Sequence, residues 1–238
     1  MAVAVVLAVA AVCATVVADR DTARPAPAWA TRTVRSGPQL LADGPRTLLV
    51  DNVSGRVEIT GSPTSRVTAE YLPTAGATFD AVTLDAVTAE GTTRVTCAPA
   101  AADPAPRCDG LLRLGVPAGA DLVVRQESGE IALSGLRGDL TLSLASVRCT
   151  AVDLRPARAS VSVRSGSADL GFAGAPDDLS VDSTSASLTL RLPSDAYAFT
   201  SEQTSADVRI GLPSSPDSAH RVRLHTVSAS VAVLPSGP

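Results

Sequence analysis

The side chains that could carry chemistry are few. The chain has two histidines, His220 and His225, and neither has a cysteine or another histidine at a metal-ligand spacing, which favours exposed surface histidines over zinc ligands. Glycoside hydrolysis needs a pair of neighbouring carboxylates. No carboxylate column recurs in adjacent copies of the repeat, and no glycine-rich phosphate loop, metalloprotease helix or CxxC pair is present, so we expect no catalytic residue, no metal site and no cofactor. The aspartates considered for such a pair are Asp169, Asp177, Asp178 and Asp207.

Serine is the candidate nucleophile that recurs at a regular spacing. Six serines follow one another in steps of 18, 19, 20, 20 and 23 residues, and an earlier copy of the pattern adds a seventh. A nucleophilic serine needs a positioned base, so repetition in every copy favours a structural ladder over catalysis. The predicted ladder consists of Ser54, Ser128, Ser146, Ser165, Ser185, Ser205 and Ser228.

The residues around each serine repeat with it. Apolar residues recur six and four positions before the serine and three and five positions after it, and only Ser201 breaks these columns. Each apolar pair has period two and predicts a short β-strand with one buried face. A residue that is mostly small follows the serine, which predicts a corner where the serine hydroxyl can bond nearby backbone.

This pattern predicts an all-β fold, a β-solenoid of about seven short coils resembling a single-stranded β-helix. Successive coils are expected to stack at the strand spacing of about 4.8 Å. Residues 60–121 interrupt the series, and strands are expected at 67–72, 81–89, 92–97 and 111–116. We expect these strands to be antiparallel and to cap or extend the N-terminal end of the stack, with a tight turn at Glu90 and Gly91.

The N-terminal segment suggests export. Residues 2–18 carry no charge and could form one apolar transmembrane helix or a cleaved signal. The domain boundaries predicted from composition are an anchor or signal at 1–18, a flexible linker at 19–46, an N-terminal β region at 47–121 and regular repeats at 122–235. We therefore expect a single-pass membrane protein with an extracytoplasmic C-terminal domain, the alternative being a secreted protein.

The four cysteines are Cys13, Cys97, Cys108 and Cys149. Cys97 and Cys108 flank a stretch rich in proline and alanine, with a separation of 108 − 97 = 11 positions. In an oxidising compartment the favoured interpretation is a disulfide between these two cysteines, and the alternative is two free thiols.

Composition excludes one class of partner. The net charge is −4, with 20 basic residues against 24 acidic ones, and no basic block is present. A nucleic-acid-binding protein needs a positive face to neutralise phosphates, so we expect no nucleic-acid partner. Aromatic residues make up only 3% of the chain, so the core must be built from Val, Leu, Ile and Ala.

The repeats resemble those of the bacterial putative-adhesin family of β-strand repeats, a domain family of unknown function. The resemblance covers about residues 47–235 and is carried by NVSGRVEI, VPAGADLVV and ESGEIALSGLRGDLTL. The paired cysteines before the VPAG segment are also similar to that family. The resemblance implies a single-stranded β-helix-like head, often held to the membrane by one N-terminal helix.

Together these features predict a non-catalytic extracytoplasmic β-repeat module, an adhesin or envelope interaction protein with an unknown protein or envelope polymer as its partner. One alternative is an enzyme of the β-helix type that acts on envelope polysaccharide. The other is an accessory protein of a membrane sensor or regulator.

Overall fold

The computed structural model describes residues 28–53, 55–73, 82–97 and 110–237, and these are all-β. Seventeen strands belong to one large mixed sheet. The predicted apolar helix at 2–18 lies outside the described residues. The strands of the N-terminal part are β1 (Ala28–Val34), β2 (Gln39–Asp43), β3 (Thr47–Asp51), β4 (Arg56–Ser62), β5 (Arg66–Leu72), β6 (Val82–Ala89), β7 (Thr92–Cys97) and β8 (Leu111–Pro117). The remaining strands are β9 (Asp121–Ser134), β10 (Leu140–Leu154), β11 (Arg158–Phe172), β12 (Asp178–Thr184), β13 (Ala186–Leu192), β14 (Ala198–Thr204), β15 (Asp207–Ile210), β16 (Arg221–Val227) and β17 (Ser230–Pro235).

The repeat predicted from the serines sets the register of the parallel ladders. Ser146 of β10 lies opposite Ser128 of β9 on one side and Ser165 of β11 on the other. The first half of β11 pairs with β12 and its second half pairs with β13, both in parallel. The predicted alignment of the repeats is therefore confirmed for these strands.

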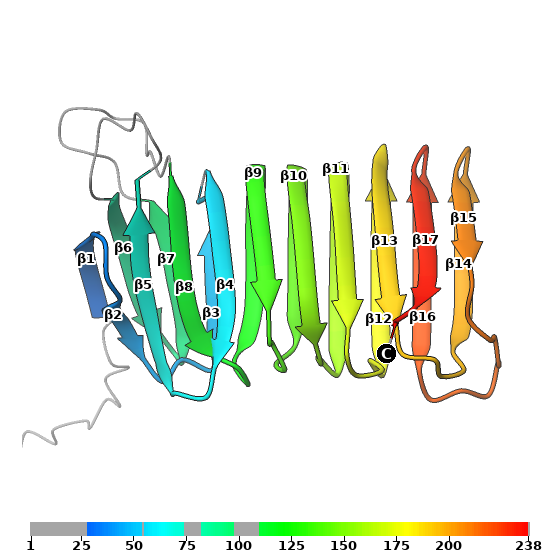
Figure 1. Cartoon of the computed structure of the whole chain (residues 1–238), viewed down its shortest axis with the longest axis horizontal. Helices are drawn as coiled ribbons and strands as arrows, with labels where there is room; N and C mark the ends of the chain where they lie inside the picture. The colour runs from blue at the N-terminus through cyan, green and yellow to red at the C-terminus, as the bar shows by residue number, and fades with distance from the viewer. Residues whose placement is uncertain (1–27, 54, 74–81, 98–109, 238) are drawn as a thin grey trace, which may run out of the picture.

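Alternation along the strands places one side of each in the core. In β10 the burial pattern alternates from Leu140 onward, with Leu142 and Leu144 buried and Ser143 exposed. Because each repeat has a strand before the corner and a strand after it, the apolar columns of the two strands form a common cluster. Figure 1 shows the two series of strands as two layers running the length of the molecule.

The order of the repeats at the C-terminal end differs from the expected stacking in sequence order. β16 and β17, the last strands of the chain, pair with β12 and β13 on one side. On their other side they pair with β14 and β15. The final repeat is thus inserted between two earlier ones, and β14 and β15 lie at the end of the sheet (Figure 1).

Charge and polarity explain this inserted order. His225 of β16 lies opposite Asp182 of β12 and opposite Glu202 of β14. Stacking in sequence order would instead place Asp182 next to Glu202, and like charges directly opposite each other are destabilising. Ser201, which breaks the apolar column, is exposed because β14 has no further strand on its outer side among the described residues. The end repeat therefore presents polar side chains to solvent.

The N-terminal end is also reordered. β3 and β4 pair in parallel with β9 on one side and with β7 and β8 on the other. β7 and β8 pair antiparallel with β6 and β5, so the expected antiparallel arrangement holds for only one side of β7 and β8. The predicted turn at Glu90 and Gly91 is confirmed, and both residues have positive φ.

The prediction of a flexible linker at 19–46 is wrong for the part that the structure describes. β1 pairs antiparallel with β6, and β2 pairs antiparallel with β5. Val34 and Leu41 are buried in the common core. This segment lacks the repeat pattern from which strands were predicted. Antiparallel strands at the end of a sheet can form without that pattern.

The corners that join the strands of a repeat differ in backbone geometry, and at Ser146 and Val147 neither residue has a positive φ. Where glycine follows the ladder serine, the glycine has positive φ, as at Gly129 (107°) and Gly166 (114°). Where alanine follows, the positive φ moves to the serine itself, at Ser185 (53°), Ser205 (51°) and Ser228 (51°). Because the alanine does not need a positive φ itself, its side chain can point into the core, and Ala186 and Ala229 are buried. Loss of the glycine therefore changes the corner geometry.

Candidate functional site

The two layers present different outer surfaces. We call the outer surface of the strands before each serine the leading face (β3, β12, β14, β16 and the first halves of β9, β10 and β11). The trailing face is the outer surface of the strands after it (β4, β8, β13, β15, β17 and the second halves of β9, β10 and β11). Both are rich in serine and threonine because the outward positions of the repeat are small and polar.

Charges on the trailing face neutralise one another. Within the described residues, each charged side chain of its strands has a partner of opposite sign. The pairs include Arg56 with Glu130 (2.8 Å), Arg113 with Glu58 (2.8 Å), Arg148 with Glu130 (3.5 Å), Arg191 with Asp169 (3.1 Å) and Arg209 with Asp207 (2.8 Å). Exposed pairs contribute little stability, but they leave few free charges for a ligand.

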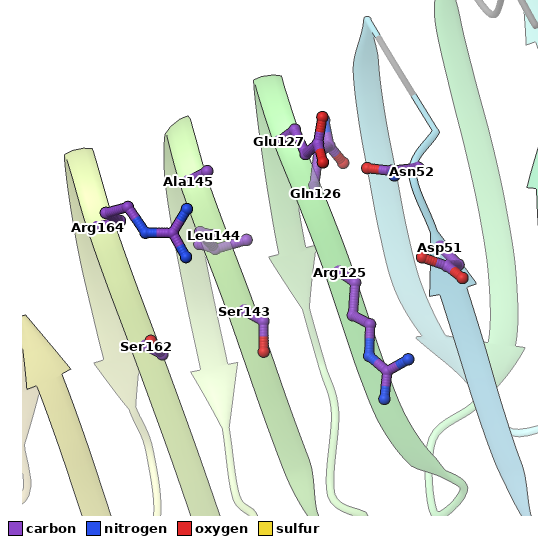
Figure 2. Close-up of a pocket in the computed structure, with 10 residues that line it drawn as sticks. All are labelled: Asp51, Asn52, Arg125, Gln126, Glu127, Ser143, Leu144, Ala145, Ser162 and Arg164. Carbon is purple, nitrogen blue, oxygen red and sulfur yellow. The ribbon is translucent and has the colours of Figure 1, made fainter.

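The leading face carries a shallow groove over β3, β9, β10 and β11. Its volume is about 360 Å³, and its lining includes Arg125, Ser143, Ser162 and Arg164. Ser143 lies opposite both Arg125 and Ser162 in the ladders, so short side chains form the floor between the two arginines. Arg164 extends from β11 toward Leu144 and Ala145 of β10 (Figure 2).

The charges in this groove are only partly neutralised. Asp51, at the β3 side, is paired with Arg94 of β7. The side chains of Arg125, Glu127 and Arg164 have no hydrogen-bond or ion-pair partner among the described residues. The guanidinium groups therefore keep their full set of donors, which suit the planar oxygens of a carboxylate or phosphate.

Gln126 supplies a second unsatisfied group at the groove. Its side chain is 3% exposed, and its Nε2 donates to the backbone oxygen of Ser128 at 2.8 Å. Its Oε1 is buried and has no donor within the described structure. The residue occupies a core column, opposite Leu144 in the ladder. A buried carbonyl without a donor costs free energy, and Ser183 and Thr226, which also lie two residues before their ladder serines, likewise have buried hydroxyls without a partner in the described structure.

The four candidate carboxylates are separated and individually paired. Asp169 and Asp207 lie on the trailing face with Arg191 and Arg209 as partners. Asp178 begins β12 and pairs with Arg223 at 2.8 Å. Asp177 precedes β12, and its Oδ1 lies 3.7 Å from Nδ1 of His220. The structure thus divides the set between a loop and two faces and does not assemble a hydrolytic pair from it.

The two histidines contact aspartates near β12. Nδ1 of His225 lies 3.3 Å from Oδ1 of Asp182, and the His225 side chain is exposed. Nδ1 of His220 lies 3.0 Å from the backbone oxygen of Pro176. No group of three metal-ligating side chains occurs in the part of the chain that the structure describes.

The ladder serines that the structure describes contribute to the corners through their backbone conformation and not through hydrogen bonds of their hydroxyl groups. Those within the described range are mostly exposed, and their hydroxyls make no hydrogen bond within that range. The expected bonds from hydroxyl to backbone are therefore not present there. At the corners after Ser128, Ser165, Ser185, Ser205 and Ser228 the serine or the glycine after it has a positive φ, whereas neither Ser146 nor Val147 has one. Ser54 lies outside the described residues.

The cysteines divide into two kinds. Cys97 ends β7 and is disulfide-bonded. Its predicted partner Cys108 lies outside the described residues, as does Cys13, so the pairing of Cys97 with Cys108 stays a prediction. Cys149 is a free thiol buried in β10, and this burial raises its pKa to about 12.

Sequence reasoning missed the groove because it searched the outward columns for carboxylates. The sequence pattern that indicates the groove is a different one. Arg125 and Arg164 occupy outward positions of their repeats, and the repeat between them has the small residues Ser143 and Ala145 at these positions. Whether their charges are free depends on side-chain partners from other repeats. Such partners cannot be assigned before the spatial order of the repeats is known.

Comparisons with known proteins give distant structural similarities. No protein-family model matches the chain, and no curated protein matches it. A putative cell adhesion protein from Clostridium sporogenes ATCC 15579 is 12% identical with a TM-score of 0.44, over 88% of this chain and 99% of that one. A putative adhesin from Bacteroides fragilis NCTC 9343 is 10% identical with a TM-score of 0.45, over 87% and 97%. A putative lipid binding protein from Parabacteroides distasonis ATCC 8503 is 13% identical with a TM-score of 0.29, over 87% and 96%.

None of the residues described by the structure forms a helix with the length and apolar character needed to cross a membrane. The predicted anchor or signal at 2–18 lies outside these residues.

Proposed function

We propose that this protein is a non-catalytic, extracytoplasmic adhesin-type module that contacts a polymer of the cell envelope through its leading face. The observation that carries the proposal is the difference between the two faces. The charged side chains of the trailing face form ion pairs with oppositely charged neighbours. In the leading-face groove, the side chains of Arg125, Glu127 and Arg164 have no partner in the described structure. A surface with unpaired donors and acceptors over a small-residue floor suits a polar, extended ligand.

The architecture that we propose for this module is a β-solenoid. The parallel ladders and the two layers support it, because each repeat contributes one strand to each layer before the chain moves on. In a solenoid each repeat contacts mainly its neighbours, which creates a long and regular surface. Such a surface repeats along the stack and can therefore contact a polymer at several points.

Attachment to the membrane through residues 2–18 belongs to the same proposal. The uncharged run supports it. A tethered solenoid would hold its leading face close to envelope polymers and raise their effective concentration. A cleaved signal would instead release the module, and the contact would then depend on affinity alone.

Co-sedimentation tests the contact. The full-length chain is incubated with purified envelope of its native host, and Arg125→Gln/Arg164→Gln is compared with the matched control Arg148→Gln/Arg191→Gln. Both variants remove two positive charges, but only the first removes them from the leading face. We expect the first variant to lose most of its sedimentation and the control to retain it. Equal sedimentation of both variants and the unaltered chain would contradict the proposal.

Fractionation with intact-mass measurement tests the attachment. The full-length mass in the membrane fraction is expected. A mass that begins near Asp19 or Thr31 in the medium would identify a secreted module and remove the tether from the proposal.

A further inference from the structure

We propose that the groove between Arg125 and Arg164 binds an acidic glycan that carries both carboxylates and free hydroxyl groups. This inference rests on the proposed function and names the chemistry of its ligand. Arginine donors match carboxylate oxygens in a bidentate geometry, and the two arginines are the unpaired cations of this groove within the described residues.

The spacing of the arginines suits an extended ligand. Arg125 and Ser162 belong to one row that crosses three strands, and Arg164 lies two residues beyond Ser162. Two strand steps and two residues along a strand place the two Cα atoms about 12 Å apart. Arg164 extends toward β10, whereas Arg125 extends away from it, toward the β3 side of the groove (Figure 2). A ligand that contacts both guanidinium groups must therefore extend across β9 and β10, over Ser143.

The other end of the groove requires hydroxyl groups. Glu127 and Asn52 line it together with Gln126, and the Glu127 carboxylate would repel a ligand charged at every unit. A sugar hydroxyl, by contrast, can donate to that carboxylate. The Oε1 of Gln126 also lacks a donor, and a ligand hydroxyl would reach it only if the buried side-chain amide moved. A glycan supplies both groups, whereas polyphosphate supplies only charge.

The surrounding surface limits the ligand to a shallow, polar contact. The groove is open and has no aromatic side chain among its lining residues. Sugar rings therefore cannot stack there, and affinity must come from charge-assisted hydrogen bonds. Binding of this kind weakens strongly as salt is added.

Titration calorimetry with three probes tests the inference on the full-length chain. The probes are polygalacturonate, its fully methyl-esterified form and polyphosphate. We expect polygalacturonate to bind, the neutral ester to bind at least about tenfold more weakly and polyphosphate to bind more weakly than polygalacturonate. Arg125→Gln/Arg164→Gln should lose at least about tenfold in affinity for polygalacturonate, and Arg148→Gln/Arg191→Gln should stay within about twofold.

Gln126→Leu separates a ligand contact from a structural role. Leucine removes the unsatisfied carbonyl and also the hydrogen bond from Nε2 to Ser128 O, so the variant should change the unfolding temperature little while weakening glycan binding. Equal binding of the acid and its ester, equal losses in the two arginine variants, or tighter binding of polyphosphate would each overturn the assignment to an acidic glycan. Envelope co-sedimentation that survives such a result would leave the proposed function standing and reject only this ligand.

Discussion

Gly166 forms the corner of β11, and replacing it with alanine tests how the repeats turn. Its φ of 114° lies where residues with a Cβ are strained. A Cβ built at this position would also meet the backbone oxygen of Val147 at 2.3 Å, within the ladder of the neighbouring repeat. Backbone atoms in a paired strand cannot move aside easily, so the corner must change or the strand must shift.

The expected loss of stability has two bounds. If the corner keeps its conformation, an outlying φ for a non-glycine residue costs about 1–3 kcal/mol. If it switches to the other corner, as at Ser185 and Ala186, the positive φ moves to Ser165. A left-handed serine then costs about 1–2 kcal/mol. We therefore expect Gly166→Ala to lower the free energy of unfolding by about 1–3 kcal/mol.

Urea unfolding followed by circular dichroism measures this change from the midpoint and slope. Gly171→Ala on the same strand is the matched control, because its Cβ would approach Ala151 O only to 3.3 Å and its φ is not positive. It should change the unfolding free energy by less than about 1 kcal/mol. The double variant Ser165→Gly/Gly166→Ala should recover stability, because glycine then occupies the position that turns.

Two results would refute this reasoning. One is a loss in Gly166→Ala no larger than in Gly171→Ala. The other is a double variant no more stable than Gly166→Ala, which would mean that the corner cannot move by one residue.

Three further predictions follow from the inserted repeat and from the buried thiol. Leu224→Ser should lower the unfolding free energy by about 3 kcal/mol or more, because Leu224 is 2% exposed. Ser201 lies opposite Leu224 in the end repeat, and Ser201→Leu should change the unfolding free energy by less than about 1 kcal/mol. Equal effects of the two variants in urea unfolding would contradict the inserted order. His225→Glu should place a third carboxylate in one row with Asp182 and Glu202 and lower the unfolding free energy by about 0.5 kcal/mol or more. Limited proteolysis should cut the segment that follows residue 197 faster in this variant than in His225→Gln. Identical proteolysis of the two variants would count against the charge argument. Cys149, with its pKa raised to about 12 by burial, should stay unalkylated by iodoacetamide at pH 8 until the chain unfolds, as seen by peptide mass; rapid labelling of the folded chain would contradict its burial. Because that folded pKa lies above the ordinary value of 9.0, the stability contributed by Cys149 is complete below pH 9.0 and is lost as the pH rises toward 12.

The register of the repeats could be predicted from sequence because each serine has the same apolar neighbours. The pairing of Ser146 with Ser128 and Ser165 follows directly from that alignment. The order of the last repeats could not be predicted in the same way, since the apolar columns accept either neighbour. Asp182 and Glu202 carry the distinguishing information through their like charges, which His225 separates, and Ser201 carries it through its polarity.

The candidate groove was harder to predict than the fold. Arg125 and Arg164 differ from Arg148 and Arg191 in lacking side-chain partners among the described residues, and the partners Glu130 and Asp169 come from other repeats. Gln126 lies two residues before its ladder serine, a position that is also polar in the repeats that contain Ser183, Gln203 and Thr226. Its unsatisfied Oε1 becomes visible only when the donors around it are known.

Arginine footprinting in native envelope tests the central claim that the leading face makes the contact. The full-length chain is treated with phenylglyoxal in the presence and absence of host envelope, and modification of each arginine is measured by peptide mass. Envelope should protect Arg125 and Arg164 and leave Arg148 and Arg191 as reactive as before. Protection of the trailing-face arginines, or of neither pair, would contradict the account.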